Sequence, residues 1–481
     1  MNLQLLIKAL RRQDLVVMAP AADVELDRID VDSRSVKPGT LFMALRGSAV
    51  DGHTFIPQAV GNGASALLVE QAVTAIVPMV VVRDGRRAAQ VVAETWYDRP
   101  TRQMQLVGIT GTNGKTTTTA MMRHLLNRDH DAGSIGTLGA FDANGEKVKS
   151  SAGSLTTPGP LDLQATFRGL FDRGVRHVAM ETSSHALDQG RLDGLAFAAG
   201  IFTNLTHEHL DYHVTLDAYL AAKLRLADLV VPDGVLSVNA DDPAWGKLRA
   251  DRRTIAWGSA RDADLPVTDA VYSSSGSRFT LGGRFGTREV SIPFLGEFNV
   301  ANAVGAAAVA LGLGEPIDEV VERLAGAPQV PGRMERLADK PFTVLRDYAH
   351  TPDAYQRVFS MLRPLIPGKF FILFGCGGER DGAKRPIMGK IAADFADRVI
   401  VTSDNPRRED PEKIIDDIVA GMPGGSFDRI FDREEAIAHA LKSARPGDTV
   451  LLVGKGHETY QIEGTNYRHF DEREIVASLL K

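Results

Sequence analysis

Short apolar runs, each bounded by glycine, proline or polar residues, recur along the chain and alternate with longer amphipathic or alanine-rich segments. Apolar runs of about four to eight residues with such boundaries are typical of buried strands. This pattern predicts a central set of strands at residues 105–110, 175–181, 199–204 and 234–239. It predicts a later set at residues 342–347, 369–375, 398–403 and 449–454. Because strands alternate with helices, we expect mostly parallel sheets in an α/β fold.

The first hundred residues predict a smaller α/β unit. An amphipathic helix is expected at the N-terminus, followed by a helix at 56–62 and strands at 66–69 and 79–82. The segment that ends at Pro100 is interpreted as a linker, and the Pro-Gly pair at 331–332 breaks the chain before a new strand. The sequence therefore predicts three domains, at residues 1–100, 101–332 and 333–481.

Length and composition agree with this organisation. A chain of 481 residues has room for about three domains. Its 44% apolar and 24% charged residues are ordinary for a soluble globular protein. The net charge of −6 argues against a large nucleic-acid footprint, so no nucleic-acid partner is expected. Phosphate ligands stay compatible with it, because they need only local positive charge.

The single cysteine, Cys376, excludes an internal disulfide and a multi-cysteine metal site. The N-terminal helix carries interior charges and lacks the apolar core of a signal peptide. No apolar run approaches the roughly 18 residues that a membrane-spanning helix needs. We therefore expect a cytoplasmic protein with no membrane association.

Residues 105–119, QLVGITGTNGKTTTT, carry the strongest chemical signal. A strand is predicted to enter a tight loop at 111–116, and a helix is predicted from Thr117 onward. In such a loop the backbone N–H groups converge, the helix dipole adds positive potential, and Lys115 supplies a full charge. The hydroxyl of Thr116 is placed to hold Mg²⁺ against phosphates. Position 109 is isoleucine where the usual spacing has glycine, so the sequence predicts a variant nucleotide loop in preference to a mere glycine-rich turn.

Two polar clusters follow predicted central strands. Glu181 ends one strand, and a carboxylate near a phosphate loop is a natural Mg²⁺ ligand. The alternative is that the residues after it only cap a helix. The second cluster, residues 204–213, holds three histidines and two acids. Its spacing excludes an HExxH zinc site, which leaves a divalent-ion site and a solvated polar loop as open alternatives.

Two further sites stay open on the residues alone. Lys223 lies in a mostly apolar helix predicted at 216–229, where a lone lysine is more often a surface residue with a packed stem. Ser33 and Arg34, beside Lys37, could grip a phosphate, although a polar turn between strands is slightly favoured.

Each later strand is predicted to end in a loop rich in Gly, Asp, Arg or His. These loops are residues 347–352, 375–381, 404–407 and 454–458. Because parallel strands bring their carboxyl ends to one edge of the sheet, we expect the loops to face one ligand site. Cys376 is interpreted as a small buried residue and not a nucleophile, since no histidine adjoins it.

A series of motifs in fixed order resembles the Mur ligases of peptidoglycan synthesis. They are DSR (32–34), GTNGKTT (111–117), TTP (156–158), ETSSHAL (181–187), NLTHEHLDYH (204–213), AYLAAK (218–223), GEFNVAN (296–302), PGRME (331–335), DYAHTPD (347–353), GCGGERD (375–381), DNPR (404–407) and GKGHE (454–458). Each motif is short, but their joint order is specific and spans essentially the whole chain. The resemblance implies a uridine-nucleotide domain, a central P-loop ATPase domain and a Rossmann-like C-terminal domain for an amino acid.

The resemblance also implies an ATP-dependent acid–amino-acid ligase. In such an enzyme, ATP phosphorylates the terminal carboxylate of UDP-N-acetylmuramoyl-L-alanyl-D-glutamate, and the amine of an amino acid attacks the acyl phosphate. The tetrahedral intermediate then collapses to amide and phosphate. The protein mainly positions the reactants and neutralises charge. The implied partners are these small molecules, Mg²⁺ is the implied cofactor, and a monomer is expected.

Site residues are implied by their places in the matching motifs. The catalytic residues are Lys115, His209 and Lys223, the last carried as N6-carboxylysine, a carbamate. The Mg²⁺ ligands are Thr116, Glu181, His209 and Lys223. The ATP contacts are Gly111, Thr112, Asn113, Gly114, Lys115, Thr116, Thr117, Asn302, Arg333 and Asp347. The muramoyl-dipeptide contacts are Val31, Ser33, Ser48, Ala49, Val50, Thr156, Thr157, Ser183, Gln189 and Arg191.

The carbamate reverses the surface interpretation of Lys223, because an anion can approach Mg²⁺ where an ammonium would be repelled. The third amino acid is implied by DNPR, which marks members that add meso-diaminopimelate, while members that add lysine usually depart from it at the arginine. Arg407 suits a distal carboxylate as a bidentate fork and would repel the lysine ammonium. The implied diaminopimelate contacts are Arg380, Asp404, Asn405, Pro406, Arg407, Gly454 and Glu458.

Three alternatives stay open. One is the same ligation with L-lysine. Another is a folylpolyglutamate-synthase-like ligase, which shares the phosphate loop and the modified lysine but lacks the DNPR and GKGHE pair. The third is a nucleotide switch that hydrolyses ATP without ligation, and amino-acid-dependent phosphate release would separate it from a ligase.

Overall fold

The structure, a computed structural model, describes residues 1–47, 50–149, 155–251, 253–260 and 262–481. These residues form two compact units. The first comprises Met1–Pro266, Gly282–Gly286 and Ala301–Val320, and the second comprises Val267–Leu281, Thr287–Val300 and Val321–Lys481. This division does not test the domain boundaries predicted after residues 100 and 332, which stay predictions.

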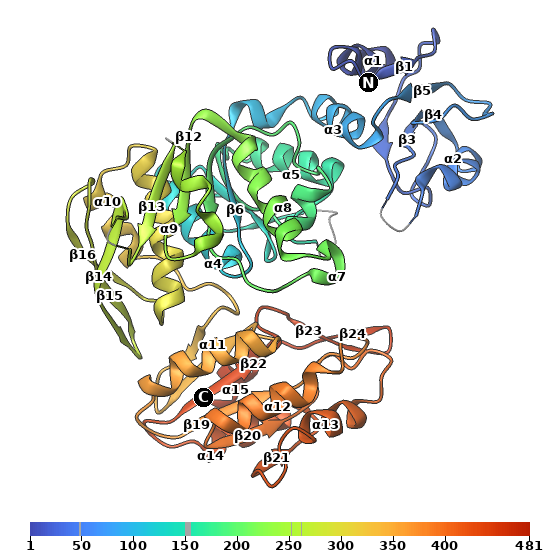
Figure 1. The fold of residues 1–481 in the computed structure, drawn as a ribbon. Coiled ribbons are helices and arrows are strands. Elements are labelled where there is room, and N and C mark those ends of the chain that lie inside the picture. Colours follow the sequence, from blue (N-terminus) through green and yellow to red (C-terminus); the bar gives the residue numbers. More distant parts are fainter. Residues whose placement is uncertain (48–49, 150–154, 252, 261) are drawn as a thin grey trace. The chain divides into compact units, whose positions relative to one another are not determined.

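The first unit begins with a small sheet in the order β1-β5-β4-β3-β2, parallel except for β1 (Figure 1). Helix α1 (Leu3–Arg11) covers it with Leu3, Ile7 and Leu10, which share one helical face and are buried. The other elements are β1 (Val16–Met18), β2 (Arg28–Asp30), β3 (Thr40–Met43), α2 (Ile56–Gly61), β4 (Ala64–Val69), β5 (Met79–Val82) and α3 (Gly85–Trp96).

A larger sheet follows, with parallel strands in the order β7-β10-β6-β11-β12-β13 and with β8 and β9 antiparallel beside β7. The strands are β6 (Gln105–Thr110), β7 (Ala132–Gly136), β8 (Gly139–Phe141), β9 (Lys147–Val148), β10 (His177–Glu181), β11 (Phe197–Phe202), β12 (Val230–Asn239) and β13 (Thr254–Gly258). The predicted central strands and their parallel arrangement are confirmed. Strand β12 begins earlier than expected, because Val230 already pairs with Phe197 of β11.

Helices pack on this sheet through apolar side chains. Phe167, Leu187 and Leu226, from α5 (Pro160–Asp172), α6 (Ser184–Asp188) and α8 (Leu216–Leu229), share one core with Leu106 of β6. Helix α4 (Lys115–Leu126) contacts β7 and β10. The remaining helices before the last sheet are α7 (Leu210–His213), α9 (Glu297–Gly312) and α10 (Ile317–Ala325). In the parts of the chain that the structure describes, no helix is long and apolar enough to cross a membrane.

The second unit holds most of an antiparallel meander and a doubly wound sheet. The meander is β14 (Leu265–Ser273), β15 (Gly276–Leu281) and β16 (Arg288–Ile292). The sheet has the order β17-β18-β22-β19-β20-β21 and is parallel except for β17. Its strands are β17 (Glu335–Ala338), β18 (Thr343–Asp347), β19 (Phe370–Phe374), β20 (Arg398–Val401), β21 (Phe427–Arg429) and β22 (Thr449–Val453), and a separate hairpin joins β23 (Tyr460–Glu463) to β24 (Asn466–His469).

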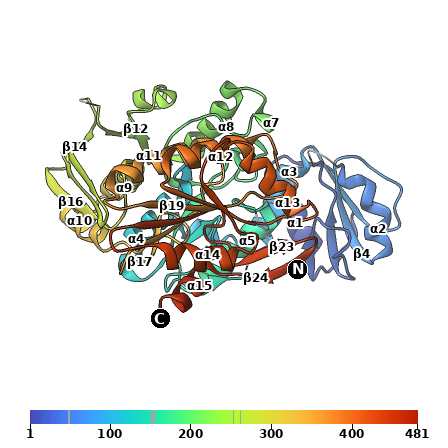
Figure 2. The same cartoon turned by 90° about the horizontal axis from the view of Figure 1, so that it is seen from below.

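Alternate residues of this sheet enter two cores, as a pleated strand requires. Phe370 and Ile372 of β19 pack with α11 (Pro352–Leu362), α12 (Lys384–Phe395) and α13 (Pro411–Val419). Phe371 and Leu373 pack with α14 (Arg433–Ser443) and α15 (Glu472–Leu479). Figure 2 shows α11 and α12 on one side of β19 and α14 and α15 on the other. The predicted α/β fold with a doubly wound C-terminal sheet is confirmed.

One buried ion pair ties this sheet together beyond its strand ends. Arg433, at the start of α14, and Glu472, at the start of α15, are both fully buried, with 2.8 Å between Nη2 and Oε1. The same guanidinium donates hydrogen bonds to the carbonyl oxygens of Ser403 (3.4 Å) and Val453 (3.0 Å). Arg433 therefore joins the residues that end or follow β20 and β22, on either side of β19.

We expect Arg433→Met to destabilise the second unit by about 3–5 kcal/mol, because it leaves the Glu472 carboxylate buried without its counter-ion. The double variant Arg433→Met/Glu472→Leu should recover part of this loss, since it removes the stranded charge. Native-state hydrogen exchange of the β22 amides would measure the opening free energy of this unit.

The matched control is Arg429→Met, because Arg429 also pairs with two carboxylates, Glu412 and Asp416, but on the exposed surface. Its expected cost is within about 1 kcal/mol. Equal costs for the two single variants would contradict a structural role for the buried pair.

Candidate active site

The phosphate loop leaves β6 and enters α4 directly. The helix begins at Lys115, two positions before the predicted start at Thr117, because Gly114 (φ +86°) turns the chain straight into it. A side chain at position 114 would need a rare left-handed backbone and would collide with Oδ1 of Asn302. Asn302, from α9, also accepts a hydrogen bond from the Thr118 hydroxyl at 3.2 Å. The structure therefore brings Asn302 against the loop, beside residues 111–117.

Two lysine side chains meet at this loop. Lys115 Nζ donates to the carbonyl oxygens of Gly111 (2.9 Å) and Thr112 (2.7 Å), and Lys223 Nζ donates to the same Gly111 oxygen at 2.7 Å. Lys223 is only 1% exposed, so its interpretation as a surface residue is wrong. The helical pattern showed an apolar face but not that the phosphate loop covers it.

The Lys223 amine has an unusual electrostatic environment. Burial lowers the pKa of Lys223 well below its usual value, and the nearby charge of Lys115 lowers it further, while Glu208 acts in the opposite direction. The ring of Tyr219 lies 4.3 Å from Nζ. A buried amine beside a second cation is favoured in its neutral, nucleophilic form.

Glu181 lies beside the start of the phosphate loop, because β10 pairs with β6 so that Glu181 stands opposite Ile109. It is 2% exposed. Its Oε1 accepts a hydrogen bond from the backbone N–H of Thr137 at 2.8 Å, and its Oε2 accepts one from the Thr137 hydroxyl at 3.1 Å. The helix cap is a different residue, Ser183, whose hydroxyl accepts from the Ala186 N–H. The cap alternative thus applies to Ser183 and not to Glu181.

The histidine cluster divides into two parts. His209 is exposed and adopts a left-handed backbone (φ +56°). His213 is buried, 3.0 Å from the hydroxyl of Ser184, so the solvated-loop alternative fails for this residue. His185 bridges the two, with ring centroids 4.8 Å from His209 and 5.4 Å from His213. Burial, and then the charges of these neighbours, lower the pKa of His185 to about 4, which keeps this imidazole neutral.

In the described parts of the chain, no group of three or more His, Cys, Asp or Glu side chains is placed to hold a metal. The donor set predicted for Mg²⁺ comprises a hydroxyl, a carboxylate, an imidazole and a modified lysine. Mg²⁺ in nucleotide enzymes takes one or two carboxylates and completes its shell with phosphate oxygens and water. The predicted set has few protein ligands, and most of them bind through oxygen. It therefore fits a Mg²⁺ ion that is also bound by the phosphates of a nucleotide and by water.

Five of the residues predicted to contact the muramoyl-dipeptide, Thr156, Thr157, Ser183, Gln189 and Arg191, form one network around Glu181. Thr157 donates to the Glu181 carbonyl oxygen at 2.9 Å and accepts from the Ser183 N–H at 3.0 Å. Arg191 donates to the Thr157 carbonyl oxygen (3.0 Å) and to Gln189 Oε1 (2.6 and 3.0 Å). The hydroxyls of Thr156 and Thr137 lie 3.3 Å apart.

Sequence reasoning missed two members of this network. Thr137 follows β7 and joins Thr156 to Glu181, and Tyr212 accepts from the Gln189 side chain at 3.1 Å. Tyr212 stands inside the histidine motif at 204–213, but the motif does not indicate this contact, and Thr137 carries no motif signal at all.

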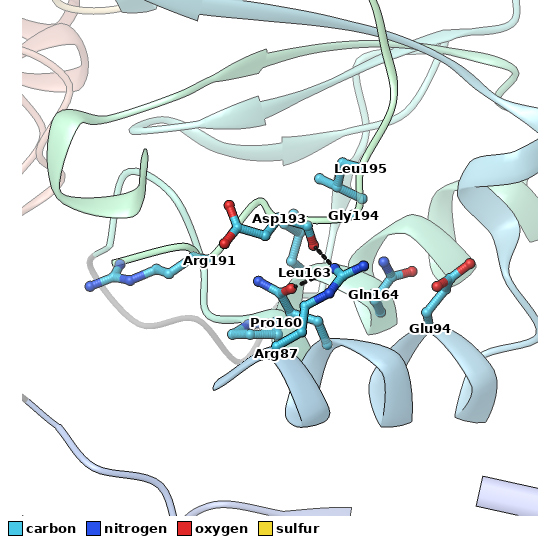
Figure 3. A pocket seen from close by; sticks show the side chains of 10 residues that line it. Arg87, Glu94, Pro160, Leu163, Gln164, Arg191, Asp193, Gly194 and Leu195 are labelled. Carbon is cyan, nitrogen blue, oxygen red and sulfur yellow. Dashed lines mark hydrogen bonds between the residues drawn. The ribbon is translucent and has the colours of Figure 1, made fainter. Parts of the chain in front are cut away.

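A small pocket adjoins this network beside Arg191, lined by α3, by α5 and by the loop after α6 (Figure 3). Arg87 of α3 donates to the Asp193 carbonyl oxygen at 2.9 Å and to Gln90 Oε1 at 3.1 Å. The Gln90 amide in turn donates to the Gly190 carbonyl oxygen. Helix α3 therefore fixes the backbone of the segment that carries Gln189 and Arg191.

The predicted substrate contacts in the first fifty residues are only partly described. Ser48 and Ala49 lie outside the described residues, and Val31 and Val50 are exposed. Ser33 is buried and donates to Gln58 Oε1 at 2.7 Å. Arg34 pairs with Asp32 of its own turn at 2.7 Å, which supports the polar-turn alternative for this arginine.

In the second unit, four adjacent parallel strands end at one edge of the sheet, as predicted. Their last residues are Asp347, Phe374, Val401 and Val453. Gly454, just beyond β22, has φ +109°, and a Cβ there would lie 2.9 Å from Asp404 Oδ2. Asp404 is buried. Glycine is thus required where the loops after β20 and β22 approach each other.

Asn405 and Arg407 bind the neighbouring loops. Asn405 Nδ2 donates to Glu458 Oε2 at 2.8 Å. Arg407 Nη1 donates to the Gly378 carbonyl oxygen at 2.7 Å, and its backbone N–H donates to the Ile462 carbonyl oxygen. Arg407 also has φ +54°. Asn405, Pro406 and Arg407 are thus packed among the loops after β19 and β22, whereas Arg380 is exposed.

A buried arginine, Arg385 of α12, fixes two of these loops together. It is 4% exposed and pairs with Glu409 (2.7 Å) and Asp417 (2.9 Å). It also donates to the Gly377 carbonyl oxygen at 3.3 Å. Because Glu409 follows the DNPR residues and Gly377 lies in the loop after β19, Arg385 sets the spacing between them.

The remaining predicted residues of this unit behave differently. Cys376 is buried, and burial raises its pKa to about 12, which confirms the interpretation as a structural thiol. Asp347 accepts hydrogen bonds from the N–H groups of Met334 and Ala349, both at 2.7 Å, and burial raises its pKa. The Arg333 guanidinium lies 4.7 Å from the Tyr348 ring.

Comparison with known proteins finds related sequences and structures along nearly the whole chain. Family models match the chain at residues 25–103 (Mur ligase family, catalytic domain), 109–310 (Mur ligase middle domain) and 332–456 (Mur ligase, glutamate ligase domain). A UDP-N-acetylmuramoyl-L-alanyl-D-glutamate--2,6-diaminopimelate ligase from Synechococcus elongatus is 42% identical over 98% of both chains.

Solved structures agree as well. The structure of a UDP-N-acetylmuramoyl-L-alanyl-D-glutamate--2,6-diaminopimelate ligase matches 95% of this chain and 94% of its own, with 33% identity and a TM-score of 0.68. A folylpolyglutamate synthase from Mycobacterium tuberculosis matches 76% of this chain and 92% of its own, with 19% identity and a TM-score of 0.61, which shows a shared fold alone. With family matches in all three regions and a relative this similar over nearly its full length, this chain belongs to the Mur ligase family.

Proposed function

We propose that this enzyme ligates meso-diaminopimelate to UDP-N-acetylmuramoyl-L-alanyl-D-glutamate, with ATP converted to ADP and phosphate. The observation that carries the proposal is the 42% identity, over 98% of both chains, to a relative named for this reaction. The loop between Asp404 and Arg407 supports the choice of amino acid, because its arginine suits a second carboxylate. L-lysine stays the alternative acceptor.

The proposed reaction begins with phosphoryl transfer. A terminal carboxylate oxygen of the dipeptide attacks the γ-phosphorus of ATP, a new P–O bond forms, and ADP leaves. Lys115 and the amides at the start of α4 would neutralise the phosphates. Thr156, Thr157, Ser183, Gln189 and Arg191 would orient the dipeptide, since they form one network around Glu181.

The second step makes the amide. The incoming amine, after loss of a proton, attacks the acyl-phosphate carbon to give a tetrahedral intermediate. Collapse of the intermediate breaks the C–O bond and releases phosphate. A carboxylate alone is a poor electrophile, so the phosphate leaving group is what ATP contributes. The remaining task of the protein is alignment, which supplies a large share of such rate enhancements.

Mg²⁺ is the proposed cofactor, held by Thr116, Glu181, His209 and the modified Lys223. When bound, it would neutralise charge on the phosphate oxygens. The buried Glu181 carboxylate, which stands beside the start of the phosphate loop, supports this assignment.

Lys223 is proposed to carry a carbamate. Its neutral amine would attack CO₂, forming an N–C bond and releasing one proton, and the product is an anion suited to Mg²⁺. Burial and the charge of Lys115, which both favour the neutral amine, support this modification.

The working unit is proposed to be a cytoplasmic monomer that meets only small-molecule substrates. ATP as co-substrate supports a cytoplasmic site. Sedimentation of the active enzyme would test whether it works as a monomer.

The deciding experiment compares amino acids as acceptors. Purified enzyme with ATP, Mg²⁺ and the UDP-dipeptide should release phosphate in proportion to added meso-diaminopimelate, with much less release on L-lysine. Equal rates with both amino acids would contradict the diaminopimelate assignment. Phosphate release independent of any amino acid would point to a nucleotide switch, and release with folate and glutamate would point to the folylpolyglutamate alternative.

We expect Arg407→Ala to raise KM for meso-diaminopimelate by about 10–100-fold, because it removes a charge-assisted hydrogen bond to carboxylate. KM for ATP should stay unchanged. Initial rates at varied amino acid measure this.

The neighbouring Arg408 is exposed and provides the matched control. Arg408→Ala should leave both KM values near those of the native enzyme. If Arg408→Ala raised KM for diaminopimelate as strongly, the specific role of Arg407 would be lost.

We expect Lys223→Ala to lower kcat by about 10²–10³-fold, since it removes an anion that the reaction uses electrostatically. Formate or acetate should restore part of the rate by supplying a carboxylate in the cavity. Phosphate release with and without each acid measures the rescue.

The control is Lys247→Ala, an exposed lysine of the same unit, which should keep full activity and show no response to the acids. If formate and acetate left the rate of phosphate release by Lys223→Ala unchanged, that result would contradict the carbamate.

A further inference from the structure

Lys455, in the loop after β22, is a buried cation that the proposed reaction does not use. Its side chain is fully buried, with 0% exposure. In the sequence it follows Gly454 and precedes Glu458 by three positions. An ammonium group leaves water at a high free-energy cost unless close partners compensate it. The partners of Lys455 therefore indicate why the fold keeps it there.

Both polar partners belong to the proposed amino-acid site. Lys455 Nζ donates to Asn405 Oδ1 at 3.1 Å and lies 3.6 Å from Glu458 Oε2. The rings of Tyr460 and Phe470, at 5.9 and 5.8 Å from Nζ, face the remainder of the cation.

The ammonium decides how the Asn405 amide is turned. An ammonium only donates hydrogen bonds, so the atom that faces it must be the amide oxygen. The backbone N–H of Ile462 also donates to this oxygen, at 3.0 Å. Both acceptor positions of Oδ1 are thus occupied, and Nδ2 is aimed at Glu458 Oε2, at 2.8 Å. Asn405 and Lys455 thus both approach the same oxygen of Glu458, Oε2.

We propose that Lys455 is a positioning residue for the amino-acid site. It fixes the Asn405 amide and supplies the counter-charge for Glu458, so that Oε1 of Glu458 accepts a hydrogen bond from an ammonium group of the incoming diamino acid. This inference rests on the proposed function, because it assigns the diamino acid as the ligand of Glu458.

The electrostatics of Glu458 support this role. Burial raises the pKa of Glu458, and the negative charge of Asp404 raises it further. The charge of Lys455, together with hydrogen bonds from Asn405 and Lys455, acts in the opposite direction. The phenols of Tyr348 and Tyr460 also lie close enough to Glu458 to interact with its charge. Lys455 is therefore a cation that favours the ionised form of this carboxylate, and a protonated carboxyl would attract an ammonium far less.

The test is Lys455→Met, which keeps the volume and removes the charge. We expect KM for meso-diaminopimelate to rise at least tenfold, while KM for ATP stays unchanged and kcat falls little. The acid limb of kcat/KM for meso-diaminopimelate should move to higher pH, because the pKa of Glu458 rises without its counter-charge. A merely structural lysine would not move this limb.

Two further variants separate the contributions. Lys455→Gln keeps a donor for Asn405 but no charge, so it should show the shift of the acid limb with a smaller rise in KM. It also serves if Lys455→Met fails to fold. In a Glu458→Gln background, Lys455→Met should raise KM less than it does in the native enzyme, because the carboxylate through which Lys455 acts is absent.

The matched control is Lys390→Met. Lys390 of α12 is also paired with a carboxylate, Asp394 at 2.9 Å, but on the exposed surface. It should leave KM and the pH profile unchanged. The inference is overturned if Lys455→Met and Lys455→Gln keep the native KM and acid limb, or if the effects of Lys455→Met and Glu458→Gln simply add. If phosphate release by the native enzyme did not respond to meso-diaminopimelate, that result would instead overturn the proposed function.

Discussion

Two lysine amino groups donate to one carbonyl oxygen at the start of the phosphate loop, and the chemistry proposed for the first unit depends on that contact. Lys115 and Lys223 both donate to Gly111, so two like charges would be held close together in a buried place. Repulsion is relieved either by anions bound nearby or by loss of charge from Lys223. ATP phosphates would supply the first, and a neutral or carbamylated Lys223 the second. The same unfavourable pair thus favours both the proposed nucleotide binding and the proposed modification of Lys223.

Parallel strand pairing determines what else reaches this loop. The register between β10 and β6 places Glu181 opposite Ile109, and the register between β11 and β6 places Phe202 opposite Thr110, so that the histidine segment follows at the same edge. In the second unit, four strands deliver the loops at Asp347, Gly375, Asp404 and Gly454 in the same way. Glu181 and Asp347 end paired strands, and Gly375, Asp404 and Gly454 follow paired strands within three positions. The hydrogen-bonded ladder therefore sets their positions.

The sequence allowed the strands and the phosphate loop to be predicted, because apolar runs and a Gly-Lys-Thr turn are local signals. Side-chain surroundings were less accessible. The apolar helix around Lys223 indicated a surface lysine, and only the fold shows that the loop at Gly111 covers it. Thr137 was missed because its contact with Glu181 joins residues 44 positions apart in sequence. The helix start at Lys115 differed from the prediction because Gly114 takes a backbone angle that no sequence pattern displays.

Loops beyond the last paired residue of a strand have no ladder to hold them, and in the second unit buried cations fill that role. Arg433 joins the carbonyl oxygens of Ser403 and Val453, Arg385 joins Gly377 to Glu409, and Lys455 holds Asn405. A cation with several donors can fix more than one loop at once, which an apolar side chain cannot do. Their burial is costly, yet an apolar replacement would leave the carbonyl and amide groups of the loops unpaired. Stability and site geometry in this unit therefore depend on the same side chains.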